Sequence, residues 1–218
     1  MIQTGIISQH AATNISLVRH GRVHNPSHIF YGRLPGFPLS KTGRREAART
    51  ARVLKDLNIR EVISSPLLRC RQTAAEILKY HHLKLKVSSL ITEVSTPFEG
   101  ESEDLVQSRH GDVYTGNGPK YEQPEDILLR VQKFLLRTRR RFCKKHVVAV
   151  THGDVICFMM LWASNLAVTP FNKKRFTTLG ILKEYPAVSS VTTFSYSTSA
   201  KDERPSISYF NPMVHLSK

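Results

Sequence analysis

The chain of 218 residues lacks a long apolar run, and it has few cysteines. No stretch reaches the roughly eighteen apolar residues that a membrane-spanning helix needs. The first 14 residues also lack the basic start and long apolar stretch of a secretory signal. The cysteines, Cys70, Cys143 and Cys157, share no zinc-like spacing and suggest reduced thiols. We therefore expect a cytoplasmic protein without a membrane partner.

Acidic residues are also scarce, because 17 Asp and Glu stand against 32 Lys and Arg, a formal net charge of +15. The excess favours an anionic partner, whether a phosphorylated metabolite, nucleic acid or a membrane surface. The densest basic run, residues 137–145, falls within a predicted amphipathic helix over 124–144. Its predicted solvent face carries Arg130, Lys133, Arg137, Arg140, Arg141 and Lys144. The run is most simply a solvated helix face, so we do not expect nucleic acid as a partner.

The chain shows no internal repeat, low-complexity segment or Pro/Gly/Ser-rich linker, so we predict a single domain over residues 1–218. Apolar and β-branched runs predict strands at 14–18, 60–64, 85–90, 146–153, 188–196 and 206–210. Helical spacing predicts helices at 41–57, 65–82, 124–144 and 154–165. This alternation predicts an α/β fold, a three-layer α/β/α sandwich with a mainly parallel central sheet. The two last strands, within 186–211, are expected to join that sheet.

Two predicted strands end in the same way, in "RHG" and in "THG". Ligands of such sheets bind beyond the carboxyl ends of the strands, so His20 and His152 are expected to share a site. Arg19 and His20 would point to opposite faces of a regular strand. The strand must therefore end at about this pair, and we expect Gly21 to let the chain turn away.

A third segment, "SSPLLRCRQTA" at residues 64–74, adds Arg69 near the start of a helix that follows another strand. Ser64 and Ser65 are expected to cap that helix, whose free N–H groups suit an anion. Arg19 and Arg69 can each direct two N–H groups at phosphoryl oxygens. The three segments together therefore predict a phosphate pocket that contains histidines.

Phosphoryl transfer from an ester needs a nucleophile and an acid. A neutral histidine with a free ring nitrogen can attack phosphorus and form a covalent intermediate. The acid must protonate the leaving oxygen and later activate water. We choose Glu93, just past the predicted strand 85–90, with Glu99 and Glu101 as rivals.

The segments "LVRHG", "SSPLLRCRQTA", "ITEV…EG" and "AVTHGDV" resemble, in order and spacing, the four signatures of the histidine phosphatase superfamily, the phosphoglycerate-mutase-like proteins. The similarity covers about residues 14–165. It implies an α/β/α sandwich, a phosphorylated nucleophile at His20, a phosphate pocket completed by Arg19, Arg69 and His152, and Glu93 as proton donor. It also implies a small phosphorylated substrate and neither a metal nor a cofactor.

Two departures favour the phosphatase branch over the mutases. Family mutases carry a tryptophan and one more residue before the asparagine that here is Asn25, and they tend to have an arginine where this chain has Val94. Gly21, Arg22, Asn25 and Arg33 are candidate substrate-binding residues. A phosphoglycerate-mutase-type phosphotransferase and a non-catalytic basic module that binds polyanions remain the alternatives. The alternating C-terminal strands leave a homodimer open, and the natural substrate is not selected.

Overall fold

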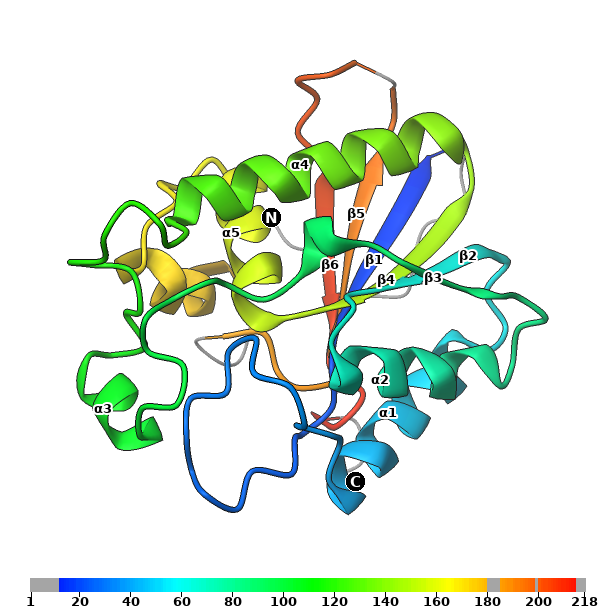
Figure 1. The fold of residues 1–218 in the computed structure, drawn as a ribbon. Coiled ribbons are helices and arrows are strands. Elements are labelled where there is room, and N and C mark those ends of the chain that lie inside the picture. Colours follow the sequence, from blue (N-terminus) through cyan, green and yellow to red (C-terminus); the bar gives the residue numbers. More distant parts are fainter. Residues whose placement is uncertain (1–11, 180–184, 199, 215–218) are drawn as a thin grey trace.

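The computed structural model describes residues 12–179, 185–198 and 200–214, and a six-stranded sheet lies at its centre (Figure 1). The strands are β1 (Thr13–Arg19), β2 (Ile59–Ser64), β3 (Leu85–Val87), β4 (His146–Thr151), β5 (Val191–Tyr196) and β6 (Ser206–Phe210). Their order across the sheet is β3-β2-β4-β1-β5-β6. The first four in this order run parallel, while β5 pairs antiparallel with both β1 and β6. The predicted mainly parallel sheet is confirmed, and both C-terminal strands belong to it.

Helices cover both faces of this sheet (Figure 1). They are α1 (Lys41–Leu54), α2 (Leu68–Leu78), α3 (Glu103–Ser108), α4 (Pro124–Arg141) and α5 (Gly153–Ala163), with 3₁₀ helices η1 (Ser89–Ile91) and η2 (Phe171–Leu179). Side chains alternate along β4, so Val147 and Ala149 join the core beneath α4 and α5. Val148 and Val150 face the other way and pack with residues of α1 and α2. These two cores give the predicted three-layer α/β/α arrangement.

Several boundaries differ from the prediction for identifiable reasons. The strand predicted at 85–90 pairs with β2 only over Leu85–Val87, and the chain then turns into η1, which buries Ile91. Helix α2 begins at Leu68 rather than at residue 65. Helix α3 was not predicted, because 6 residues are too few to show helical periodicity. The 3₁₀ helix η2 was not predicted either.

The predicted solvent face of α4 is wrong at Arg130. Its side chain is only 14% exposed and binds Glu122, with Nε 2.8 Å from Oε1. Arg137, Arg140 and Arg141 are exposed as predicted, and Lys144 is exposed beyond the end of the helix. The amphipathic pattern therefore gives the buried apolar side correctly, but it does not show that a long arginine reaches an acid on another segment.

The strongly apolar helix α5 is buried along most of its length. In the parts of the chain that the structure describes, no helix is both long and apolar enough to cross a bilayer. The single domain, the homodimer and the cytoplasmic location stay predictions.

Candidate active site

Three neighbouring strands end at one edge of the sheet and deliver the predicted site residues there. Arg19 on β1 pairs with Thr151 on β4, and Ser64 on β2 pairs with Val150, so the carboxyl ends of these strands are level. His20 follows β1 directly and His152 follows β4 directly. Their rings meet edge to face, with centroids 5.3 Å apart. Strand β1 thus ends at Arg19, where the shared-site argument required it to end.

Gly21 is needed for space rather than for its conformational freedom. The strand ends before Gly21, but the φ of Gly21 is not positive, so the chain does not use the left-handed conformation that favours glycine. A Cβ at this position would lie 2.4 Å from the carbonyl oxygen of Gly43 in α1. The Gly21 N–H donates to the Thr73 hydroxyl at 3.1 Å. The chain after His20 is therefore packed tightly against two helices, α1 and α2.

The hydrogen bonds of His20 define its tautomer. Its Nδ1 lies 2.9 Å from the Gly21 carbonyl oxygen, which can only accept, so Nδ1 carries the proton. Its Nε2 accepts from Nε of Arg69 at 3.3 Å. Burial, followed by the charges of Arg69 and Arg19, holds the pKa of His20 well below its usual value. The ring is therefore neutral at neutral pH, with a lone pair on Nε2.

Arg69 connects the two histidines from below. It is 1% exposed, and its Nη2 lies 3.3 Å from Nδ1 of His152. The same Nη2 donates to the Gly32 carbonyl at 2.7 Å, and the guanidinium lies 4.8 Å from the centre of the Tyr31 ring. Arg69 thus holds the loop at residues 31–32 over the histidines.

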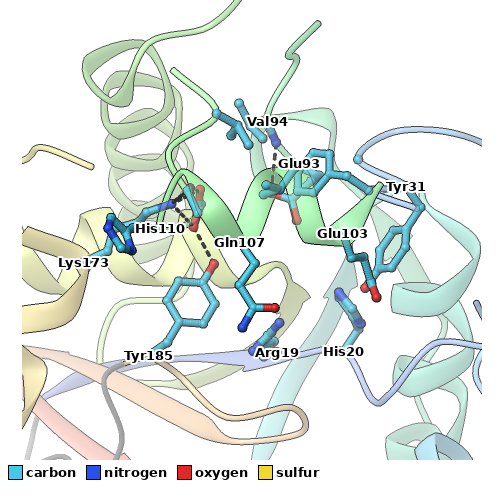
Figure 2. A pocket seen from close by; sticks show the side chains of 16 residues that line it. Arg19, His20, Tyr31, Glu93, Val94, Glu103, Gln107, His110, Lys173 and Tyr185 are labelled. Carbon is cyan, nitrogen blue, oxygen red and sulfur yellow. Dashed lines mark hydrogen bonds and ion pairs between the residues drawn. The ribbon is translucent and has the colours of Figure 1, made fainter. Parts of the chain in front are cut away.

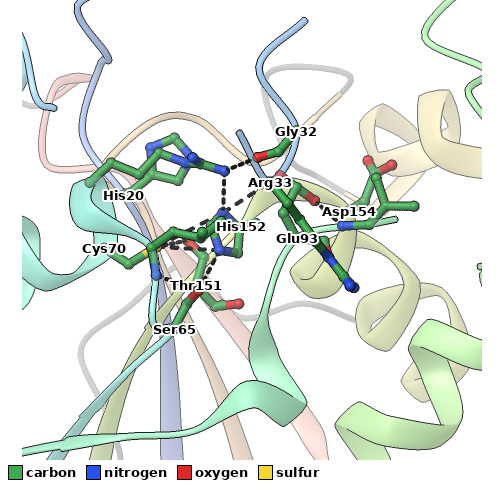
Figure 3. A network of polar contacts seen from close by, with 12 residues as sticks. His20, Gly32, Arg33, Ser65, Cys70, Glu93, Thr151, His152 and Asp154 are labelled. Atoms are coloured by element: carbon green, nitrogen blue, oxygen red, sulfur yellow. Dashed lines mark hydrogen bonds and ion pairs between the residues drawn. The ribbon is translucent and has the colours of Figure 1, made fainter. Parts of the chain in front are cut away.

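His152 is neutral and fixed by the chain that precedes α2. Burial and the charge of Arg69, then smaller effects, hold the pKa of His152 well below its usual value. Since Nδ1 accepts from Arg69, Nε2 carries the proton and donates to Oγ of Ser65 at 2.7 Å (Figure 3). The prediction that Ser64 and Ser65 cap α2 is wrong, because Leu67 is the N-cap and makes no side-chain capping bond. The Ser65 hydroxyl positions a histidine instead.

Glu93 lies beside His152 and lines the pocket described below (Figure 3). Its Oε2 is 3.5 Å from Nδ1 of His152, and its Oε1 accepts from the Val94 N–H at 3.0 Å. Burial, then the negative charge of Asp154, raises the pKa of Glu93. The contact between Glu93 and the neutral His152 is therefore not an ion pair.

The rival acids lie elsewhere. The Glu99 carboxylate accepts from the Arg33 N–H at 2.6 Å, and Glu101 is exposed. Neither residue lines the pocket. Of the three candidate acids, only Glu93 is placed next to the histidines.

The backbone of Glu93 is held by two arginines. Nε of Arg33 donates to the Glu93 carbonyl at 2.7 Å, and Nη2 of Arg130 donates to it at 3.3 Å. Both arginines also bind Glu122. Arg33, predicted as a substrate contact, is thus engaged behind Glu93 and does not line the pocket.

The other predicted contacts are also engaged with protein groups. The Arg22 side chain is 65% exposed, near Glu46, and does not line the pocket. The Asn25 amide donates to the Ile29 carbonyl at 2.9 Å and to Oε1 of Glu103 at 3.0 Å. The roles of Gly21, Arg22, Asn25 and Arg33 in substrate binding stay predictions.

Arg19 contacts two residues just before β5 that the sequence did not mark as part of the site. Its Nη1 donates to the Pro186 carbonyl at 2.7 Å, and its guanidinium lies 4.9 Å from the centre of the Tyr185 ring. The Tyr185 hydroxyl in turn donates to Asp154. Arg19 is therefore supported by a tyrosine from the segment before β5.

Asp154 is the centre of a buried polar cluster at the start of α5. It accepts from the hydroxyls of Tyr114 and Tyr185 and from Nζ of Lys173 at 3.0 Å. Burial alone would raise the pKa of Asp154, but Lys173 and the tyrosine hydroxyls outweigh burial and lower it. Asp154 directly follows "THG", which was the one available signal, whereas nothing in the sequence marked Lys173.

A pocket of about 810 Å³ opens above these groups (Figure 2). Arg19, His20 and Glu93 lie in its lining, while Arg69 and His152 lie behind them, buried. The remaining lining comes from the loop at residues 30–32, from α3 and the chain after it, and from Val94, Asp154, Lys173 and Tyr185. Part of the predicted bordering loop, residues 111–124, contributes through Gly111 and Val113.

A neutral imidazole with a lone pair on Nε2, two arginines and a carboxyl group of raised pKa form a set that can transfer a phosphoryl group. Guanidinium groups can donate to charge on the equatorial oxygens of a phosphoryl group. An imidazole of this kind can act as a nucleophile, and a carboxylic acid can protonate a leaving oxygen.

Comparisons with known proteins identify the family of the chain. A sequence profile of the histidine phosphatase superfamily, branch 1, matches residues 15–183. "Uncharacterized protein Rv0525" of Mycobacterium tuberculosis is 49% identical over 167 residues, which are 72% of this chain and 79% of that protein. "Uncharacterized phosphatase PhoE" of Bacillus subtilis is 30% identical over 146 residues, 66% of this chain and 74% of that protein.

Solved structures show the same fold. Bacillus stearothermophilus YhfR superposes with a TM-score of 0.70 at 21% identity, over 84% of this chain and 91% of that one. The mycobacterial glucosyl-3-phosphoglycerate phosphatase Rv2419c superposes with a TM-score of 0.68 at 20% identity, over 91% of this chain and 96% of that one. At such identities the likeness concerns the fold alone.

Proposed function

The chain belongs to the histidine phosphatase superfamily, and on this premise we propose that it hydrolyses a small phosphomonoester through a phosphohistidine on His20. The observation that carries the proposal is the state of His20. His20 and Arg19 both line the pocket. The ring of His20 is buried and neutral, its Nδ1 proton is directed at the Gly21 carbonyl, and its Nε2 accepts from Nε of Arg69. Such a nitrogen is ready to attack phosphorus.

In the first step, Nε2 of His20 forms a bond to phosphorus while the bond from phosphorus to the ester oxygen breaks. Glu93 donates its proton to the leaving oxygen, so the alcohol departs neutral. The Arg69 Nε–H, which donates to Nε2 before the reaction, is then free to turn to a phosphoryl oxygen. The Gly21 carbonyl stabilises the Nδ1 proton as the ring gains positive charge.

In the second step, water attacks the phosphohistidine from the side that the alcohol has left. Glu93, now ionised, takes a proton from that water. The phosphorus–nitrogen bond breaks, and its electron pair returns to Nε2 of His20. Inorganic phosphate is released, and both side chains regain their starting protonation.

Replacement of His20 tests the nucleophile. His20→Ala should lose phosphate release from p-nitrophenyl phosphate and acid-labile labelling by a radioactive phosphomonoester. The exposed His82 provides the matched control, and His82→Asn should keep both. Retained turnover in His20→Ala would remove His20 as the nucleophile.

Replacement of Glu93 tests the proton donor. Glu93→Gln should slow hydrolysis of alkyl phosphates by about 100-fold or more, because an alkoxide leaves poorly without a proton. Hydrolysis of p-nitrophenyl phosphate should fall far less, since its phenolate leaves unaided. Equal losses for both substrates would remove Glu93 as general acid.

Two measurements separate this proposal from other chemistry of the same site. We propose that no metal takes part, so phosphate release should persist in the presence of a chelator. If 3-phosphoglycerate yields an isomer in place of free phosphate, the protein is a mutase and the proposed hydrolase activity is wrong.

A further inference from the structure

Helix α3 directs two polar side chains into the mouth of the pocket. Glu103 and Gln107 are four residues apart, on one face of the helix, and both line the pocket. Figure 2 shows Glu103 beside Tyr31 on the side of His20, and Gln107 beside Tyr185 and Arg19. Neither side chain takes part in the proposed chemistry, but both lie where the alcohol part of a bound phosphomonoester must pass.

The Glu103 carboxylate is held in place by the loop that follows His20. The backbone N–H of Glu103 donates to the His28 carbonyl at 2.8 Å, and the adjacent Ser102 forms an antiparallel β-bridge with Ile29. Its Oε1 accepts from the Asn25 amide at 3.0 Å, and its Oε2 lies 3.5 Å from Nδ1 of His28. The side chain is still 47% exposed, so part of the carboxylate is free to meet a ligand.

Positive charge in the lining is already committed. Among the described lining residues, the arginines and lysines are Arg19 and Lys173. Arg19 belongs to the proposed phosphate site. Nζ of Lys173 binds Asp154 at 3.0 Å and the Gly111 carbonyl at 2.8 Å. The lining therefore offers neither an arginine nor a lysine for a second anion, whereas Glu103 adds a negative charge.

We infer that Glu103 and Gln107 select the alcohol part of the substrate. The preferred substrate is a phosphomonoester whose alcohol carries hydroxyl or ammonium hydrogen-bond donors and no carboxylate or second phosphate. A carboxylate can only accept hydrogen bonds, so Glu103 binds a substrate group that donates one and repels an anionic group. The inference deepens the proposed function and rests on it, since Glu103 acts only on an ester bound at His20.

Glycerol 3-phosphate and 3-phosphoglycerate form a matched pair for the test, because they differ only in a hydroxymethyl group against a carboxylate. The wild-type kcat/KM should be about tenfold higher for glycerol 3-phosphate, the effect of one like-charge contact in a partly solvated site. O-Phosphoethanolamine carries the ammonium donor and should also exceed 3-phosphoglycerate. Its rate relative to glycerol 3-phosphate identifies which donor Glu103 favours.

Glu103→Gln keeps the shape of the side chain and the acceptor for Asn25 but removes the charge. This variant should raise kcat/KM for 3-phosphoglycerate and bring the pair to within about threefold. The matched control is Asp104→Asn, which removes the same charge from the exposed part of α3 outside the pocket and should leave the ratio unchanged.

The inference is overturned if wild-type enzyme hydrolyses both members of the pair equally, or if Asp104→Asn shifts the ratio as much as Glu103→Gln. It is also overturned if p-nitrophenyl phosphate is hydrolysed while glycerol 3-phosphate and O-phosphoethanolamine are not. In each case His20-dependent hydrolysis of p-nitrophenyl phosphate keeps the proposed function intact. Loss of that hydrolysis from the wild-type protein would instead refute the proposed function.

Discussion

His146, at the start of β4, makes the stability of the fold sensitive to acid. The side chain is buried at the sheet end opposite the pocket, and its Nε2 lies 2.8 Å from Oγ of Ser16. Burial, then the charge of His81, lowers the pKa of His146 to about 4. The unfolded chain binds a proton there near pH 6.5, so acid favours the unfolded state until the folded protein is also protonated.

The size of this effect follows from the two pKa values. With about 6.5 in the unfolded chain and about 4 in the folded one, the free energy of unfolding falls by about 2 kcal/mol between pH 7.5 and pH 5. The total loss in the free energy of unfolding approaches about 3 kcal/mol below pH 4. His146→Gln removes the titration while keeping a polar group near Ser16. The loss of one well-placed buried hydrogen bond should cost the variant about 1 kcal/mol at pH 7.5.

Urea unfolding of both proteins across this pH range measures the effect. The variant should be less stable at pH 7.5 and more stable than wild type at pH 5, because only wild type carries the penalty of His146. Any acid sensitivity from His20 and His152 is present in both proteins and cancels. His82→Gln, at an exposed histidine, should follow the wild-type curve. A constant difference between wild type and His146→Gln at all pH values would refute the reasoning.

Three further changes test other parts of the structure. Gly21→Ala should destabilise the fold by about 2 kcal/mol, measured as a lower urea midpoint, because its Cβ would press on the Gly43 carbonyl; an unchanged midpoint would contradict this. Asp154→Asn removes a charge that raises the pKa of Glu93. Because the proposed acid must be protonated, the alkaline limb of the plot of kcat against pH should move to lower pH. A limb that stays in place or moves to higher pH would exclude an effect of Asp154 on Glu93. Hydrolysis should survive neutralisation of the exposed basic side chains of α4, whereas binding to heparin should weaken. A parallel loss of hydrolysis would contradict the assignment of these side chains to a solvated helix face. The side chains to replace are Arg137, Arg140 and Arg141.

The sequence was sufficient to predict that β1 and β4 end close to the histidines of "RHG" and "THG". Short apolar runs mark β1 and β4, and the charged or aromatic residues directly after them must lie at the carboxyl edge of a parallel sheet. The positions of Arg19, His20 and His152 therefore follow from local patterns alone. Arg69 follows in the same way from the strand and helix of the segment 64–74.

The parts that the sequence did not predict depend on contacts between distant segments. Arg130 lies on the polar side of a helical wheel, but its length lets it reach Glu122 and the Glu93 carbonyl. The Ser65 hydroxyl lies two residues before the N-cap of α2 and contacts His152, which is 87 residues away in the sequence. Helical and strand periodicity describe one segment at a time, so neither could reveal these pairings.

The packing of Gly21 was misjudged for a related reason. A glycine after a strand suggests freedom of the backbone, since nothing local shows what lies next to it. The close contact is with Gly43, and a Cβ on Gly43 would in turn lie 2.0 Å from the Arg22 carbonyl oxygen. Two glycines far apart in the sequence therefore depend on each other, which only the packing of α1 against this loop makes visible.

The two halves of the pocket differ in how freely they can change during evolution. The phosphate half is built from strand ends and buried groups, where a substitution disturbs the core and the chemistry together. The half that meets the alcohol is carried by α3, a short surface helix joined to the loop after His20 through Ser102 and Glu103. New substrates can therefore be acquired by exchanging the segment around α3, with the reacting groups left as they are. Divergence among relatives of this chain should be concentrated there.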